Sequence, residues 1–344
     1  MEATPQQLKV LPPPLLAWYD ENRRVLPWRE QVSPYRTWVS EIMLQQTRVT
    51  AVLPYFDRFM AALPTVAALA DAPEQQFMSL WQGLGYYSRA RNLQKAAQVI
   101  MTRHGGVFPD TYEGLTALPG VGDYTAGAIA FGQPVPAVDG NVLRLAARLT
   151  GCHDNVLEPK TRARFRRWMA EVIPSDRPGA FNQALMDLGA MVCLPNGAPL
   201  CEQCPARTFC TACEKGLQRQ LPVREKKTAR RVEQRTVFLL RRDGAAALRQ
   251  RPATGLLAGL WEFPNVPGAL TERQAAEQLA KWGLIPHQWG KSFTDKHVFT
   301  HITWEMTVFT ITVQGAGPPE WVWCPDEERE KYPMPTAFGK LEKE

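Results

Sequence analysis

Two acidic side chains, 98 positions apart, stand in the most informative stretches of the chain. Glu41 lies in the run Trp-Val-Ser-Glu-Ile-Met-Leu-Gln-Gln-Thr-Arg, and Asp139 lies in Ala-Val-Asp-Gly-Asn-Val. A carboxyl group that donates a proton, beside a second one that stays ionised, can hydrolyse a glycosidic bond. Each residue also has an ordinary interpretation, Glu41 as the opening residue of a helix after Ser40 and Asp139 as a turn former before Gly140. A helix start would lower the pKa of Glu41, so burial would have to raise it for proton donation.

A glycine hairpin precedes Asp139 by 17 residues. Gly120 and Gly122 lie in Leu-Pro-Gly-Val-Gly, immediately before a helix-forming run. Glycine lets the backbone approach a ligand closely, and exposed N–H groups at a helix start attract phosphate. The same text also fits an ordinary turn between two helices.

Five of the seven cysteines crowd between positions 193 and 213. The spacing Cys193-x7-Cys201-x2-Cys204-x5-Cys210 could hold a [4Fe–4S] cluster, with Cys213 left over. The alternative is a tetrahedral zinc held by two C-x-x-C pairs that include Cys213, although only five residues separate those pairs. We favour the cluster, in the loop 193–210. Clustered thiols also favour a metal site over disulfides, and therefore a reducing, cytoplasmic setting.

Composition sets broad limits on the protein. The 344 residues are 45% hydrophobic and 22% charged, with a net charge of +6, which is typical of a soluble protein of one or two domains. No apolar run is long enough for a membrane span, and the first residues lack the pattern of a signal peptide. Residues 221–235 contain six Lys or Arg but only two Glu, so this stretch is basic. A solvated linker explains that basic stretch as well as DNA contact does.

The periodicity of apolar residues changes along the chain. From Leu8 to about Ala190 it is helical, whereas after Pro222 alternating strand patterns appear, including Ile302 to Val308, with a helix at 272–282. We therefore expect a multidomain protein. An all-α domain covers residues 1–220, a basic linker 221–234, and an α+β domain 235–344.

Several long motifs together resemble one family. They are Ser-Glu-Ile-Met-Leu-Gln-Gln-Thr at 40–47, Gly-Leu-Gly-Tyr-Tyr-Ser-Arg-Ala-Arg-Asn-Leu at 83–93, the glycine hairpin, Asp-Gly-Asn at 139–141 and Phe-Asn-Gln-Ala-Leu-Met-Asp-Leu-Gly at 181–189. The chain resembles the MutY family of adenine DNA glycosylases over nearly its whole length. The resemblance implies a helix–hairpin–helix glycosylase domain with a [4Fe–4S] cluster on Cys193, Cys201, Cys204 and Cys210, followed by a Nudix-like domain.

The resemblance also implies roles for individual residues. Glu41 would protonate adenine at N7, Asp139 would stabilise the oxocarbenium sugar, Asn141 would hold the aspartate, and Tyr124 would lie beside the reacting sugar. Gln46 and Tyr86 would support a base flipped out of the helix. The residues matching the adenine pocket are Trp28, Arg29 and Gln183.

Tyr124 separates this chain from a close rival. Endonuclease III-like enzymes share the hairpin, the aspartate and the cluster, but they carry a nucleophilic lysine at the position of Tyr124. Tyrosine cannot form a Schiff base. We therefore expect removal of the base without efficient strand cleavage.

The C-terminal region resembles the Nudix-like module of the same family. The glutamate pair that a Nudix hydrolase needs is absent, because Ala280 and Lys281 precede Gly283. We therefore expect recognition rather than nucleotide hydrolysis. Phe299, Thr300 and His301 align with the loop that reads 8-oxoguanine, or they form a turn before the strand at Ile302.

Two departures from the family pattern affect DNA recognition. Thr300 replaces a serine, and the Cys193–Cys201 loop is one residue longer than usual and lacks Lys or Arg. The lengthened loop puts a contact with the DNA backbone in doubt but leaves the cluster ligands in place.

The sequence thus predicts a monofunctional adenine DNA glycosylase acting on double-stranded DNA with 8-oxoguanine:adenine or guanine:adenine mispairs. We expect a monomer that binds no membrane, in a bacterial-type cytoplasm in association with the nucleoid. The alternative from another class is a non-catalytic DNA-binding or redox-sensing protein on the same scaffold. Retention of both carboxyl groups argues against it.

Overall fold

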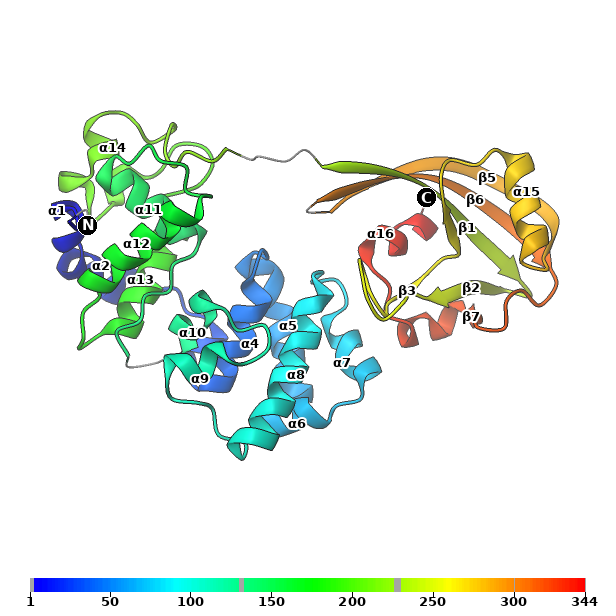
Figure 1. Cartoon of the computed structure of the whole chain (residues 1–344), viewed down its shortest axis with the longest axis horizontal. Coiled ribbons are helices and arrows are strands. Elements are labelled where there is room, and N and C mark those ends of the chain that lie inside the picture. Colours follow the sequence, from blue (N-terminus) through cyan, green and yellow to red (C-terminus); the bar gives the residue numbers. More distant parts are fainter. Residues whose placement is uncertain (1–2, 130–132, 226–229, 300, 344) are drawn as a thin grey trace. The chain divides into compact units, whose positions relative to one another are not determined.

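The structure is a computed structural model and describes residues 3–129, 133–225, 230–299 and 301–343. The chain divides into two compact units, which are shown in Figure 1. The first unit contains residues 1–71 and 92–227, and the second contains residues 72–91 and 228–344. The predicted first domain contains residues 72–91, whereas the structure groups this segment with the C-terminal region. One hydrogen bond within the second unit runs from Gln75 Nε2 to the carbonyl oxygen of Lys331, at 2.6 Å.

The described part of the first unit is built from helices, as the periodicity predicts. The segment 72–91 contributes α7 (Glu74–Trp81) and the start of α8 (Tyr87–His104) to the second unit, and α8 continues into the first. The remaining helices of the first unit are α1 (Gln6–Lys9), α2 (Pro12–Asn22), α3 (Pro27–Glu30), α4 (Pro34–Leu44), α5 (Val49–Ala62), α6 (Val66–Asp71), α9 (Tyr112–Thr116), α10 (Asp123–Ile129), α11 (Gly140–Thr150), α12 (Pro159–Val172), α13 (Pro178–Met191) and α14 (Thr211–Glu214), with short 3-10 turns at Cys201–Gln203 and Arg207–Phe209.

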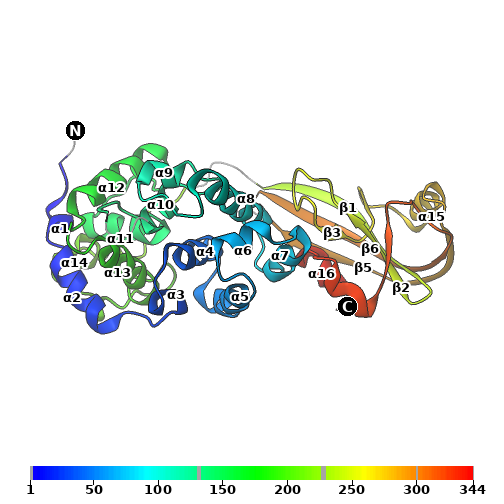
Figure 2. The ribbon, with the colours of Figure 1, turned by 90° about the horizontal axis from the view of Figure 1, so that it is seen from below.

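Helix α11 lies at the centre of one core of this unit, among α1, α2, α12, α13 and α14 (Figure 2). Asp139 is its N-cap and Gly151 its left-handed C-cap, with φ of 67°. A Cβ at Gly151 would lie 2.6 Å from the Thr211 side chain, so glycine is required by both the backbone and the packing. The helix therefore joins Asp139 at its start to the cysteine-rich segment at its end.

The described part of the second unit contains a seven-stranded sheet. Strand order is β3-β2-β1-β6-β5, with β4 paired to β1 and β7 paired to β2. The long strands β1 and β6 are parallel, and β5 is antiparallel to β6. The strands are β1 (Arg231–Arg242), β2 (Ala245–Gln250), β3 (Trp261–Glu262), β4 (Asn265–Pro267), β5 (Ile285–Val298), β6 (Ile302–Gln314) and β7 (Val322–Pro325).

Two helices cover the two faces of this sheet. Helix α15 (Glu272–Lys281) packs on one face, and α16 (Thr336–Gly339) packs on the other, beside the 3-10 turns Asp326–Lys331 and Leu341–Lys343. A capping box of Thr271 and Gln274 starts α15. The predicted helix at 272–282 and the alternation from Ile302 to Val308 are confirmed. Strand β1 begins at Arg231, four residues before the predicted start of the α+β domain at 235. No helix in the described ranges has the length and apolar character to cross a membrane.

Candidate active site

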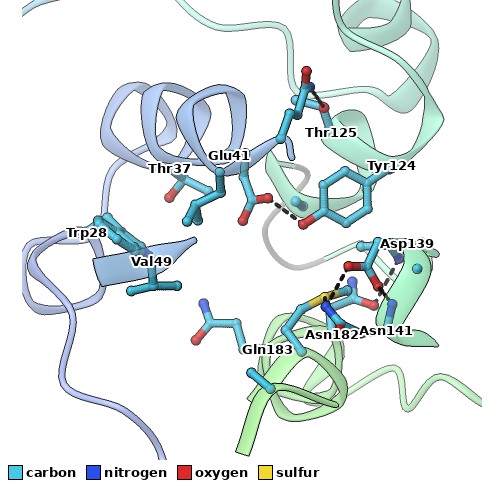
Figure 3. Close-up of a pocket in the computed structure, with 18 of the residues that line it drawn as sticks. Trp28, Thr37, Glu41, Val49, Tyr124, Thr125, Asp139, Asn141, Asn182 and Gln183 are labelled. Carbon is cyan, nitrogen blue, oxygen red and sulfur yellow. Dashed lines mark hydrogen bonds between the residues drawn. The ribbon is translucent and has the colours of Figure 1, made fainter. Parts of the chain in front are cut away.

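A cavity of about 1130 Å³ lies within the first unit, and ten of the predicted site residues line it. They come from α3, α4, α10, α11, α13 and the connecting loops, so segments far apart in sequence meet there (Figure 3). Its volume is ample for a single nucleobase, because small-molecule sites usually measure about 300–1,000 Å³. The ten residues are Trp28, Arg29, Glu41, Gln46, Gly120, Gly122, Tyr124, Asp139, Asn141 and Gln183.

Glu41 points into this cavity from the last turn of α4. The expected helix start at Ser40 is wrong, because α4 begins at Pro34, where the Ser33 side chain caps the N–H of Arg36. The C-terminal end of a helix disfavours a negative charge, so the dipole acts in the same direction as burial. Burial raises the pKa of Glu41 to about 7, the charge of Asp139 adds to this, and Tyr124 and Arg29 oppose it. Glu41 can therefore hold a proton near neutral pH.

Asp139 lies on the other side of the cavity from Glu41, at the N-cap of α11 (Figure 3). Its Oδ1 accepts from the N–H groups of Asn141 and Val142 at 2.7 and 3.0 Å, and its Oδ2 accepts from Asn141 Nδ2 at 2.7 Å. Burial is the largest influence and leaves the pKa of Asp139 above its ordinary value, although these three hydrogen bonds and the charge of Arg144 offset part of the rise. Helix N-termini and donated hydrogen bonds favour a carboxylate over a neutral acid. The surroundings thus favour the proton on Glu41 and the charge on Asp139.

Tyr124 connects α10 to the acid of α4. Its Oη donates to Glu41 Oε2 at 2.5 Å. Burial, together with the charges of Glu41 and Asp139, raises the pKa of Tyr124 well above its ordinary value, so the phenol stays protonated. The residue that replaces a lysine therefore serves as a neutral hydrogen-bond donor.

A second layer of polar residues behind Asp139 was missed by the sequence analysis. Arg144 donates from Nη2 to Asn141 Oδ1 at 2.9 Å and from Nε to the carbonyl oxygen of Cys193 at 2.8 Å. Asn182 accepts from the N–H of Ala137 at 3.0 Å and so holds the loop before Asp139. The sequence does contain a signal for these residues, because Arg144 and Asn182 are polar residues within helical runs that are otherwise apolar.

The opposite wall contains the residues expected around a purine. Trp28 is buried and packs edge-on against Phe56, with ring centroids 5.1 Å apart. Arg29 contacts the fully buried Asp187 through both nitrogens of its fork, at 2.7 and 3.0 Å. Although burial raises the pKa of Asp187, Arg29 and Arg24 lower it to a value below its ordinary one. Arg29 thus lines the cavity with its guanidinium already held in a bidentate ion pair.

The two hairpin glycines have different reasons to be glycine. Gly120 has φ of 76°, and a Cβ there would lie 2.6 Å from the Asn92 side chain. Gly122 has nothing within 4 Å of an added Cβ, so its surroundings leave room for a ligand to approach the backbone.

Gln46 and Tyr86, the two residues predicted to support a flipped base, share an unusual backbone conformation. Gln46 has φ of 59° and Tyr86 has φ of 48°, in the left-handed region that residues other than glycine seldom adopt. Such strain is concentrated at functional sites. Gln46 lines the cavity, whereas Tyr86 lies in the second unit, is 42% exposed and is not part of the cavity wall.

The predicted lesion-reading residues belong to the second unit. Phe299 and His301 lie between β5 and β6, and the N–H of Phe299 donates to the carbonyl oxygen of Ile302 at 2.8 Å. The Phe299 ring packs on Trp304, with centroids 4.8 Å apart, while His301 is exposed. Thr300 lies outside the described residues.

A second, smaller cavity of about 20 Å³ is lined by Cys193, Cys201, Cys204, Cys210 and Cys213. None of these thiols forms a disulfide. Arg148 Nη1 donates a hydrogen bond to Cys193 Sγ at 3.2 Å. Within the described ranges, no three His, Cys, Asp or Glu side chains form a group that could hold a metal ion. The case for an iron–sulfur cluster therefore rests on the donor set, since four thiols with a suitable spacing face one space.

The two units match known domain families. Residues 39–171 match the HhH-GPD superfamily of base excision DNA repair proteins, and residues 236–344 match the NUDIX domain. The human adenine DNA glycosylase is 35% identical, in an alignment that covers 95% of this chain and 72% of the human one. The chain belongs to the adenine DNA glycosylase family. The glycosylase of Buchnera aphidicola subsp. Schizaphis graminum is 32% identical, with 84% of each chain covered.

Solved structures agree with the fold of this glycosylase. A thermostable thymine-DNA glycosylase matches with a TM-score of 0.56 and 28% identity, covering 62% of this chain and 100% of that one. Endonuclease III in a non-covalent complex with DNA matches with a TM-score of 0.53 and 23% identity, covering 63% and 100%, which supports the fold alone. The predicted fold class is confirmed, as is the activity of an adenine DNA glycosylase of base excision repair.

Proposed function

We propose that this glycosylase removes adenine paired with 8-oxoguanine or with guanine, with Glu41 as general acid and Asp139 as the anion that stabilises the sugar cation. One observation supports this assignment above the others: both carboxyl groups face one cavity, in surroundings that separate their tendencies to ionise. Proton transfer to N7 makes adenine a better leaving group, and a nearby carboxylate lowers the energy of an oxocarbenium-like transition state. Water then completes the hydrolysis.

Other residues of the cavity prepare these two for the reaction. Asn141 holds Asp139, and Tyr124 holds Glu41 through its hydroxyl group. Trp28, Arg29 and Gln183 would enclose the flipped adenine, and Gln46 and Tyr86 would support the opened base stack. Gly120 and Gly122 would let the DNA backbone approach α10.

The assignment is tested with duplexes that contain 8-oxoguanine:adenine, guanine:adenine and thymine:adenine pairs. Under single-turnover conditions, free adenine should appear from the first two and not from the third. Glu41→Gln should abolish release without weakening DNA binding, and Asp139→Asn should slow it at least ~100-fold, as loss of a transition-state charge does. Release from thymine:adenine at the same rate would contradict the mispair assignment.

The absence of a lysine nucleophile is part of the proposal. Tyr124 cannot form a Schiff base, so the abasic product should stay intact until alkali cleaves it. Tyr124→Lys places an amine at the same position and should yield strand cleavage that borohydride traps as a covalent complex. Cleavage by the unchanged enzyme before alkali treatment would refute the monofunctional assignment.

We also propose that Cys193, Cys201, Cys204 and Cys210 hold a [4Fe–4S] cluster. When bound, the cluster would hold the segment 193–210 together as a structural unit. Arg148 supports this, because it ties Cys193 Sγ to the carbonyl oxygens of Leu194 and Leu221. Iron and sulfide analysis of the purified protein tests the proposal, and zinc in place of iron would overturn it.

The C-terminal domain is proposed to read the 8-oxoguanine. The exposed His301, with Thr300 and Phe299, would contact the lesion, while Phe299 also packs on Trp304. Catalysis would belong to the predicted domain of residues 1–220, which contains the cavity, and recognition to the domain of residues 235–344. Strand β1 of the second domain begins at Arg231, within the predicted linker 221–234. His301→Ala should reduce the preference for 8-oxoguanine:adenine over guanine:adenine, whereas an unchanged preference would exclude this role.

We further propose that the enzyme is a cytoplasmic monomer that associates with the nucleoid. None of the seven cysteines, which all lie within the described ranges, forms a disulfide, and this supports a reducing compartment. Light scattering of the purified protein and fractionation of cells test these two points.

A further inference from the structure

The small thiol cavity has one more cysteine than a [4Fe–4S] cluster needs. Cys213 lines it together with the four proposed ligands. It lies on α14, one turn after Cys210, and its N–H donates to the carbonyl oxygen of Cys210 at 3.0 Å. Cys213 is therefore placed by the same turn that places a proposed ligand.

The neighbour of the Cys213 thiol is Cys201. Both side chains line the same cavity, and they interact through a side-chain hydrogen bond. The other proposed ligands have different partners: Cys193 Sγ accepts from Arg148, and Cys210 Sγ donates to the carbonyl oxygen of Arg148 at 3.6 Å. A sulfur atom of Cys213 could thus reach the position of the Cys201 sulfur with a small movement.

The backbone on both sides permits such a movement. Cys201 opens a 3-10 turn of three residues, and Cys213 lies in a helix of four residues. Both side chains are partly exposed rather than locked into the core. Short elements at the surface shift at a lower cost in free energy than packed core helices do.

We propose that Cys213 is a reserve ligand of the cluster, able to replace Cys201 at the iron atom that Cys201 binds. The exchange moves no electrons: the Cys213 thiol loses its proton as its sulfur binds iron, and the departing Cys201 thiolate takes one up. This inference rests on the proposed cluster. Cys213 then protects the cluster against loss of one ligand.

The test compares alanine variants, because alanine offers no substitute ligand. Cys201→Ala should keep most of the iron, sulfide and visible absorbance of the unchanged protein. Cys204→Ala and the double variant Cys201→Ala/Cys213→Ala should lose them. Cys152→Ala is the matched control, since this thiol lies outside the cavity and contacts Arg164.

The outcomes separate the reserve-ligand idea from the cluster itself. If the unchanged protein contains no iron, the proposed cofactor fails. If it contains four iron atoms and Cys201→Ala is as empty as Cys204→Ala, the reserve-ligand role is refuted.

A second measurement does not depend on the folding of Cys201→Ala. Loss of visible absorbance under an iron chelator should be several-fold faster in Cys213→Ala than in the unchanged protein or in Cys152→Ala. Equal rates in all three would also refute the proposal.

Discussion

The hydroxyl of Tyr124 donates a hydrogen bond of 2.5 Å to Glu41 Oε2 and so joins α10 to the last turn of α4. Burial keeps the phenol protonated, so this hydrogen bond favours the ionised form of the acid. Burial of Glu41 itself acts in the opposite direction and is the larger effect. The acid is therefore poised near neutral pH by two opposing influences.

The first prediction concerns the pH dependence of adenine release. The proposed role of Glu41 as general acid makes its protonated form the reactive one, so the single-turnover rate should be constant below pH 7 and fall as pH rises through its pKa of about 7. The slope above that pH should approach a tenfold loss per unit. Rates measured from about pH 5 to pH 9 on one mispaired duplex test this. A profile that stays flat to the upper limit would remove Glu41 as the acid.

The second prediction concerns stability. The pKa of Glu41 rises from 4.5 to about 7 on folding, so the folded state binds the proton more tightly than the unfolded state. Stability from this group is complete below pH 4.5 and is lost as pH rises to about 7. Glu41→Gln removes that loss and should stabilise the protein by about 3 kcal/mol at pH 8, and by much less at pH 5. Denaturant unfolding at both pH values measures it, with the exposed Glu21→Gln as control.

The third prediction separates the two influences on Glu41. Tyr124→Phe removes the hydrogen bond that lowers the pKa of Glu41, so the falling limb of the rate profile should move to higher pH. Tyr55→Phe is a suitable control, because that ring contacts Arg58. A limb that stays in place or moves to lower pH would show that the hydroxyl does not act through Glu41.

Local sequence revealed much of the site, and the reasons differ between residues. Asp139 was interpreted as a turn former before Gly140, whereas the structure makes it the N-cap of α11, which is also a local feature. The start of α4 also has a local sequence signal, because Ser33 is followed by Pro34. The sequence analysis nevertheless placed the helix start at Ser40. Choosing between two such signals needs the packing of the helix.

The remaining features depend on contacts distant in sequence. Tyr124 and Glu41 are 83 residues apart, and Asn182 and Ala137 are 45 apart. No periodicity encodes such pairs, so the hydrogen bond from Tyr124 that lowers the pKa of Glu41, and the one that holds the loop before Asp139, were visible only in the fold. The fold class was easier to predict than the site, because helical and strand periodicities are local and differ clearly between the two domains.

The fourth prediction concerns Arg162, which lines the active-site cavity from α12 and was not singled out by the sequence analysis. Its side chain is exposed, and its Nε donates to the carbonyl oxygen of Val156 at 3.2 Å. An exposed cation that lines the cavity proposed to bind DNA should contact a phosphate. Arg162→Ala should weaken binding to all duplexes alike and reduce the salt slope of log Kd by about 0.9. Arg167→Ala, on the same helix beside Glu171, is the control, and a change in mispair preference would contradict a phosphate contact.

The fifth prediction concerns Tyr19, whose hydroxyl donates to Oε1 of Gln183 from the buried side of α13. This contact leaves the NH2 end of the amide to face the cavity, as in Figure 3. The guanidinium of Arg29 lies 5.9 Å from the Tyr19 ring centroid, which further fixes the ring. In the proposed adenine pocket, Tyr19 would thus be a positioning residue that determines which end of Gln183 faces the base.

Tyr19→Phe should let the amide turn over and slow adenine release roughly fivefold to tenfold, the effect of losing one hydrogen bond of about 1 kcal/mol. In a Gln183→Leu background the same change should have no further effect, because the amide that Tyr19 orients is gone. Single-turnover rates of the four proteins complete this double-mutant cycle. If Tyr19→Phe slows the reaction equally in both backgrounds, its hydroxyl acts on the fold of the pocket and not through Gln183.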